Sequence, residues 1–91
     1  MKITFIWHET NIDEKQKEKI INDIKYEVNA QVKSRLKNVP NEITIDFFGS
    51  PFASTLKGVA STKNEDEIFT VTYSLQPGND SSYNFPENKI K

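Results

Sequence analysis

Residues 20–36 read IINDIKYEVNAQVKSRL, and the spacing of their apolar side chains decides how the chain must fold. Aliphatic residues recur every four positions, at Ile20, Ile24, Val28, Val32 and Leu36, and Ile21 lies beside the first of these. That spacing draws one apolar stripe along a helix, and a helix with a single stripe needs one apolar surface to cover. The sequence therefore predicts a long amphipathic helix with a partner layer on one side.

The ends of this helix are also marked in the sequence. Asn11 can cap the first turn, and Glu14 follows three positions later, which is the spacing of a capping box. Pro40 ends the helix, and Lys33, Arg35 and Lys37 suit the negative end of its dipole. These signals predict about 25 residues of helix, which is roughly 37 Å at 1.5 Å per residue.

Four segments alternate between apolar and polar residues, as strands with one buried face do. They are KITFIWH (2–8), EITIDFF (42–48), STLKGVAST (54–62) and IFTVTYSL (68–75). The third segment is weaker because Gly58 interrupts it, which predicts a bulge or a close backbone approach. KNEDE (63–67) supplies a hairpin turn between the last two strands.

The predicted fold class is α+β. We expect a single two-layer domain of order β-α-β-β-β over residues 1–75, with one long helix packed on a four-stranded, mainly antiparallel sheet. Residues 76–91 lack periodicity and are rich in turn formers, so a flexible C-terminal tail is expected there. The predicted core consists of Ile3, Phe5, Trp7, Ile21, Ile24, Val28, Val32, Ile43, Ile45, Phe69, Val71 and Tyr73.

Composition narrows the class of protein. The formal net charge of −1 supplies no large field to attract nucleic acid or an anionic membrane. The apolar part of MKITFIWHE is too short and too alternating for a signal peptide or a membrane span, and the chain has no cysteine. A cytoplasmic protein is expected. Arg35 is the only arginine among twelve basic residues, a bias typical of the AT-rich genome of a low-GC bacterium or its phage.

Candidate chemistry is sparse. His8 is the only histidine, and we interpret it as a surface side chain at a strand end. Asp46 lies within a strand and is expected to pair with Lys57 across the sheet. The sequence shows no pattern of metal ligands, no phosphate-binding loop and no nucleophile motif. We therefore expect no enzyme activity, no cofactor and no metal.

One helix cannot cover both faces of a sheet. The face turned away from it, called the open face below, is predicted to carry Ile6, Phe48, Val59 and Ile68. Contiguous exposed apolar side chains on a small protein often mark a partner site. Two alternatives stay open: either a partner covers this face, or the tail folds back and lays Tyr83 and Phe85 over it.

Phe52 adds a second candidate contact. The stretch FFGSPFAS (47–54) turns the chain out of its second strand and places Phe52 beyond Pro51. Phe52 either closes the end of the core or projects from a stiff loop as an interface anchor. The predicted partner-binding residues are thus Ile6, Phe48, Phe52, Val59, Ile68, Tyr83 and Phe85.

These observations favour a small non-enzymatic protein-interaction module: a regulator, inhibitor or immunity-type protein. It would bind a protein partner, or itself as a homodimer, through the open face and the Phe52 loop. The alternative is an RNA-associated or ribosome-associated accessory domain, since sheet aromatics beside lysines can stack bases. Acidic residues interleave with the helix lysines, which disfavours nucleic acid as the partner.

Overall fold

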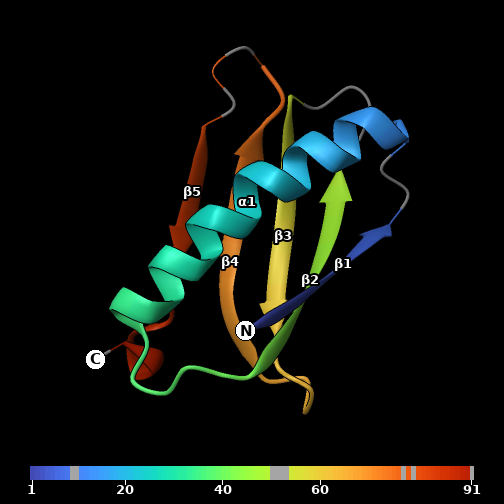
Figure 1. The fold of residues 1–91 in the computed structure, drawn as a ribbon. Coiled ribbons are helices and arrows are strands. Elements are labelled where there is room, and N and C mark those ends of the chain that lie inside the picture. Colours follow the sequence, from blue (N-terminus) through green and yellow to red (C-terminus); the bar gives the residue numbers. More distant parts are fainter. Residues whose placement is uncertain (9–10, 50–53, 77, 79, 91) are drawn as a thin grey trace.

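The computed structural model describes residues 1–8, 11–49, 54–76, 78 and 80–90. Figure 1 shows the long α-helix lying diagonally across one face of a twisted sheet. The elements are β1 (Lys2–His8), α1 (Glu14–Arg35), β2 (Glu42–Gly49), β3 (Thr55–Ser61), β4 (Glu67–Ser74), β5 (Ser81–Asn84) and the 3₁₀ helix η1 (Glu87–Lys89). The fold class is α+β, as the sequence predicted.

The strands lie side by side in their order along the chain, from β1 to β5. β1 and β2 are parallel, because α1 carries the chain back to the starting end of the sheet. The other three pairs are antiparallel neighbours joined by short connections. β1 and β5 are therefore the two edges, and β1 is the longer of them.

The predicted number of four strands was wrong, because β5 adds a fifth. Residues 81–84 pair with residues 70–73 of β4. The chain then continues through η1 to Ile90, which forms a bridge with Leu36 at the end of α1. A strand of four residues with serine at its first two positions has too short an alternation to stand out in the sequence. β5 is therefore a strand because it pairs with β4, and its own sequence does not predict it.

The start of α1 differs from the prediction. Asp13, not Asn11, caps the helix, and its carboxylate accepts a hydrogen bond from the Gln16 amide at 2.8 Å. Asn11 has a φ of 52°, a left-handed conformation that asparagine tolerates better than most residues. The chain therefore turns at Asn11 before the helix begins at Glu14. The helix also ends at Arg35 and not at Pro40, so α1 has 22 residues rather than about 25.

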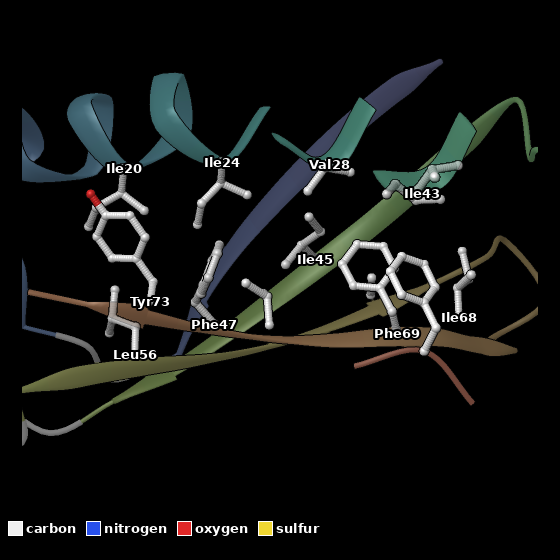
Figure 2. Packing of buried hydrophobic residues seen from close by; sticks show 14 of the residues in the cluster. Ile20, Ile24, Val28, Ile43, Ile45, Phe47, Leu56, Ile68, Phe69 and Tyr73 are labelled. Atoms are coloured by element: carbon white, nitrogen blue, oxygen red, sulfur yellow. The ribbon is translucent and has the colours of Figure 1, made fainter. Parts of the chain in front are cut away.

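The core lies between α1 and the sheet face below it. Figure 2 shows the helix side chains pointing down onto aromatic and aliphatic residues of β2, β3 and β4. The buried residues are Ile20, Ile24, Val28, Val32, Leu36, Ile43, Ile45, Phe47, Leu56, Ala60, Ile68, Phe69, Val71, Tyr73 and Phe85. The apolar stripe of α1, which repeats every four residues, is thus buried along its whole length, as the periodicity predicted.

The predicted core members on β1 are only half-buried. Ile3, Phe5 and Trp7 face the helix side but lie at the edge, where α1 passes diagonally away toward β4 and β5. The rings of Phe5 and Trp7 stack on Phe47, at centroid distances of 6.1 and 4.9 Å. Ile21 is also half-buried, on the flank of the helix stripe. β1 therefore keeps apolar surface that the other residues described by the structure leave partly exposed.

Gly58 marks a place where core side chains, rather than the backbone that the sequence analysis named, approach β3 closely. A Cβ at this position would lie 2.6 Å from Val71 Cγ1 and 2.9 Å from Phe47 Cε1. The bulge lies elsewhere, where the register between β3 and β4 shifts at Ala60 and Ser61. A glycine in β3 thus gives room for the large rings in the centre of the core.

Candidate functional site

The register of three strands gathers a group of side chains on the open face. Parallel pairing sets Ile6 beside Asp46 and His8 beside Phe48. Antiparallel pairing then sets Val59 opposite Asp46, and Lys57 opposite Phe48. These six residues form two adjacent rows across β1, β2 and β3, and we call them the β1–β3 patch. Beyond it, the open face continues with small polar residues at Thr4, Thr44, Thr55, Ser61, Thr70, Thr72, Ser74, Ser82 and Asn84.

His8 and Asp46 form a hydrogen-bonded pair in this patch. Nε2 of His8 lies 2.8 Å from Oδ1 of Asp46. The two side chains are 42% and 28% exposed, so the pair is accessible from solvent. The predicted pairing of Asp46 with Lys57 was wrong, because the register places Val59 opposite the aspartate. His8 is a partner of Asp46 as well as a surface side chain.

The imidazole of His8 also fixes the ring beside it. His8 and Phe48 stack at a centroid distance of 4.6 Å with only 8° between their planes. Phe48 is 46% exposed and Ile6 is 41% exposed, which makes them the large apolar side chains that the open face presents. A shallow hollow beside the stack is lined by Trp7, His8, Phe48 and Gly49. Asp46 thus orients His8, and His8 holds an exposed aromatic ring in place.

Ile6, Phe48 and Val59 lie on the open face, as predicted, whereas Ile68 does not. Ile68 is 3% exposed and belongs to the core. The register shift at Ala60 and Ser61 leaves Ile68 between the pairs of Glu67 and Phe69 with β3. An extra residue in one strand reverses the alternation locally, and Ile68 and Phe69 are consequently both buried.

Tyr83 and Phe85 fold back on the helix side and do not cover the open face. The Phe85 ring lies 4.9 Å from that of Phe69, and the Arg35 guanidinium stands over the Phe85 ring, 4.9 Å from its centroid. Tyr83 is half-buried with its ring edge-on to Phe69 at 5.9 Å. The alternative in which the tail lays Tyr83 and Phe85 over the open face is thus wrong. Phe52, the remaining predicted contact, lies outside the described residues.

The resolved pKa shifts lie on the helix side. Tyr73 donates a hydrogen bond of 2.7 Å to Asp23, which, with Lys19 nearby, lowers the pKa of the Asp23 carboxyl. Burial raises the pKa of Tyr73, and the bond to Asp23 raises it further. Burial likewise raises the pKa of Tyr83. These shifts belong to contacts that join helix and sheet, so they mark packing rather than a reactive site.

No group of three or more His, Cys, Asp or Glu side chains within the described ranges is arranged to hold a metal ion. α1 is neither long nor apolar enough to cross a membrane, and it is the one α-helix in the part of the chain that the structure describes. The β1–β3 patch is therefore the strongest candidate site among the described residues.

No protein-family model, curated protein or solved structure matches this chain.

Proposed function

We propose that this protein is a small non-enzymatic protein-interaction module of a low-GC bacterium or phage: a cytoplasmic regulator, inhibitor or immunity-type protein. Its partner is a protein that binds the β1–β3 patch. The observation that supports this most strongly is the exposed Phe48 ring, which is stacked on His8 and has Ile6 and Val59 in the adjacent row of the patch. Such apolar surface, on a face that no element of the described residues covers, is typical of an interface centre.

Preorganisation strengthens the case. A side chain that is already fixed before binding loses less conformational entropy when a partner immobilises it. Phe48 is held by the His8 ring, and His8 is held in turn by the Asp46 carboxylate. Asp46 is still 28% exposed and Lys57 lies at the margin, so polar groups surround the aromatic centre. An anchored ring within a polar rim is how binding hot spots are built.

Phe52 remains a predicted contact of the same interface. It follows β2 in the chain only four positions after Phe48. A partner that covers the Phe48 end of the patch would therefore be close to the start of this loop. The assignment of Phe52 rests on the sequence.

The alternative function, RNA or ribosome association, draws on one row of the same patch. His8, Phe48 and Lys57 are neighbours across three strands, which sets two stacked rings beside a cation. Aromatic rings on an open sheet can stack single-stranded bases, with cations contacting the phosphates. The net charge of −1 favours the protein partner, because phosphate binding draws on an excess of positive charge.

The test compares Phe48→Ala with the wild type as baits for proteins from a low-GC bacterial lysate, followed by titration of the purified partner. We expect the variant to bind about 10–100-fold more weakly, equivalent to about 1.4–2.8 kcal/mol, with an almost unchanged melting temperature. Tyr26→Ala is the matched control, because Tyr26 is an exposed aromatic residue of α1, 76% accessible and remote from the patch.

A second arm of the experiment addresses the alternative. Fluorescence anisotropy with a single-stranded RNA oligonucleotide at physiological salt should show no micromolar binding. Micromolar affinity that falls steeply with salt and disappears in Lys57→Glu would support the RNA function instead. Equal capture of the same proteins by the wild type and by Phe48→Ala would contradict the proposed site.

A further inference from the structure

The outer edge of β1 presents unpaired backbone groups. The Lys2 amide donates to the Asn41 carbonyl at 2.9 Å, so Lys2 points its backbone groups toward β2. Successive residues of a strand point these groups to alternate sides. The N–H and C=O groups of Ile3, Phe5 and Trp7 therefore point outward, where no other strand of the described residues lies.

This edge lacks the features that protect most free strands. Edge strands usually carry a central charge, a proline or a bulge, or they are very short. β1 has seven residues, and none of positions 3 to 7 is charged, proline or glycine. Ile3, Phe5 and Trp7 are half-buried, and Ile6 is 41% exposed on the other face. By contrast, the opposite edge is the four-residue β5, which Pro86 follows closely.

We propose that β1 pairs antiparallel with β1 of a second copy of this chain, about a two-fold axis through Phe5. The outward groups of Phe5 would then meet those of Phe5 in the second copy. Ile3 would meet Trp7 of the second copy, and Trp7 would meet its Ile3. Each of these opposed pairs exchanges two hydrogen bonds, as directly bonded antiparallel pairs do. Every outward group of the three residues is thereby satisfied.

The side chains in this register complement one another on both faces. On the helix side, Ile3 lies opposite a tryptophan and Phe5 opposite a phenylalanine. On the open face, Thr4 lies opposite Ile6 of the second copy, and Lys2 lies opposite its His8. No like charges meet, and the lysine approaches a histidine that is bound to a carboxylate. Shifting the two-fold axis by one residue in either direction leaves part of the outward edge unpaired.

The position of α1 leaves room for this arrangement. Near Trp7 the helix is close, since Lys17 stands 5.7 Å from the tryptophan ring. By its other end the helix has crossed to the far edge, where Leu36 bridges to Ile90 (Figure 1). The two-fold axis sets the covered Trp7 end of one β1 against the uncovered Ile3 end of the other. The two helices then lie on either side of the paired β1 strands and do not collide over them.

Self-complementarity is what selects a second copy over another partner. A two-fold interface requires the same strand to satisfy itself in reverse, and β1 does so in backbone, shape and charge. This inference goes beyond the proposed function because it uses the edge of the sheet, not the β1–β3 patch as a whole. In the dimer, the two open faces join into one continuous sheet surface.

The first experiment measures the mass of the full chain by sedimentation and light scattering. We expect the wild type to have twice 10.5 kDa, falling toward 10.5 kDa on dilution. Thr4→Lys combined with Ile6→Lys should raise the dimer dissociation constant at least tenfold, because lysines then face each other across the axis. Thr4 and Ile6 are both exposed in one copy, so the substitutions leave the fold intact, which circular dichroism checks.

A matched variant tests the register. Thr4→Glu combined with Ile6→Lys differs from the first variant only at position 4, and it sets each introduced glutamate opposite an introduced lysine. We expect this variant to dimerise as well as the wild type. In a register centred on position 4 or 6, like charges would meet instead and the dimer would be lost. Ser82→Lys with Asn84→Lys places the same charge on the opposite edge and should leave the mass unchanged.

Amide exchange gives an independent structural signature. In the dimer, the amides of Ile3, Phe5 and Trp7 should be protected, and dilution should expose them. The amides of Thr4 and Ile6 point toward β2 and should stay protected at every concentration. A wild type that stays monomeric at about 100 µM, or a dimer that survives the double lysine variant, would overturn the inference. So would failure of the glutamate–lysine variant to dimerise.

The outcomes also separate this inference from the proposed function. Phe48→Ala should lose the protein partner and keep the dimer, because Phe48 lies on β2 and not on the edge. A monomeric wild type that still binds its partner through Phe48 would overturn only the dimer.

Discussion

The Tyr73 hydroxyl joins the sheet to the helix through one hydrogen bond. Tyr73 is 1% exposed, and its oxygen lies 2.7 Å from Asp23 on α1. The bond lowers the pKa of Asp23, while burial together with the bond raises that of Tyr73. The folded state therefore favours the ionised carboxyl and the neutral phenol. Both preferences make the free energy of unfolding depend on pH, the first at acid pH and the second at alkaline pH.

Replacing Tyr73 by phenylalanine should reduce the free energy of unfolding at pH 7 by about 1 kcal/mol. The lowered pKa of Asp23 contributes stability above its unfolded value of about 3.9, and this is lost as pH falls. The raised pKa of Tyr73 contributes stability below about pH 10, and this is lost as pH rises. Both dependences should weaken in Tyr73→Phe, which urea titrations at pH 3, 7 and 10.5 would show.

The control for this experiment is Tyr26→Phe, which removes the hydroxyl of an exposed tyrosine on the same helix. Its unfolding free energy should stay within about 0.5 kcal/mol of the wild type at each pH. If Tyr73→Phe kept the full acid dependence of the wild type, the Asp23 contact would not be its source.

Gly58 is a second residue on which the core depends. Adding a methyl group there should cost about 1–3 kcal/mol, because Val71 and Phe47 leave no space for a Cβ. Gly58→Ala should lower the denaturation midpoint accordingly, whereas Lys57→Ala on the exposed side of the same strand should change it little. An unchanged midpoint in Gly58→Ala would mean that β3 and its neighbours can move apart at this point.

At the scale of elements, β5 is the part of the fold that departs most from the prediction. Phe85, directly after it, is 5% exposed between Phe69 and Arg35. Phe85→Ala should therefore cost about 3–5 kcal/mol, as other large-to-small core changes do. Thermal unfolding followed by circular dichroism measures this loss.

Asn84→Ala, at an exposed position one residue earlier, is the control and should leave the melting temperature almost unchanged. A free tail would give no loss of stability for Phe85→Ala either, so the pair of variants decides whether this segment is docked in solution.

The elements that the sequence predicted are those with several repeats of their own period. α1 repeats its apolar position four times and its C-cap Leu36 continues the repeat, while β1, β2 and β4 alternate over seven or eight residues. β5 offers only four residues, and the bulge beside Ile68 reverses an alternation that the sequence alone presents as regular. The cap at Asp13 was missed because the chain turns through a left-handed residue, Asn11, two positions before the cap. The β5 and Ile68 misses depend on pairing with another strand, whereas the cap depends on the local backbone at Asn11.

For the whole molecule, the candidate site could be predicted only in part. The alternation of each strand was enough to place Ile6, Phe48 and Val59 on the open face. The pairing of His8 with Asp46 needs the register between two strands that are far apart in the chain. Aligning residues 2–8 with 42–48 in parallel would have found it, since both segments have seven residues and begin just before an isoleucine.

The parallel pairing of β1 and β2 also has a consequence for biosynthesis. Each residue of β1 pairs with the residue forty positions further along the chain, whereas the other strands pair with close neighbours. Contacts between distant residues pay a larger loop-closure entropy and form late. At 5–20 residues per second, about 2–8 s pass between translation of β1 and translation of β2, with which it pairs. During every round of synthesis, β1 is therefore an unpaired apolar strand until β2 has been made. In this interval, β1 is the first segment that a chaperone can bind or that can pair incorrectly.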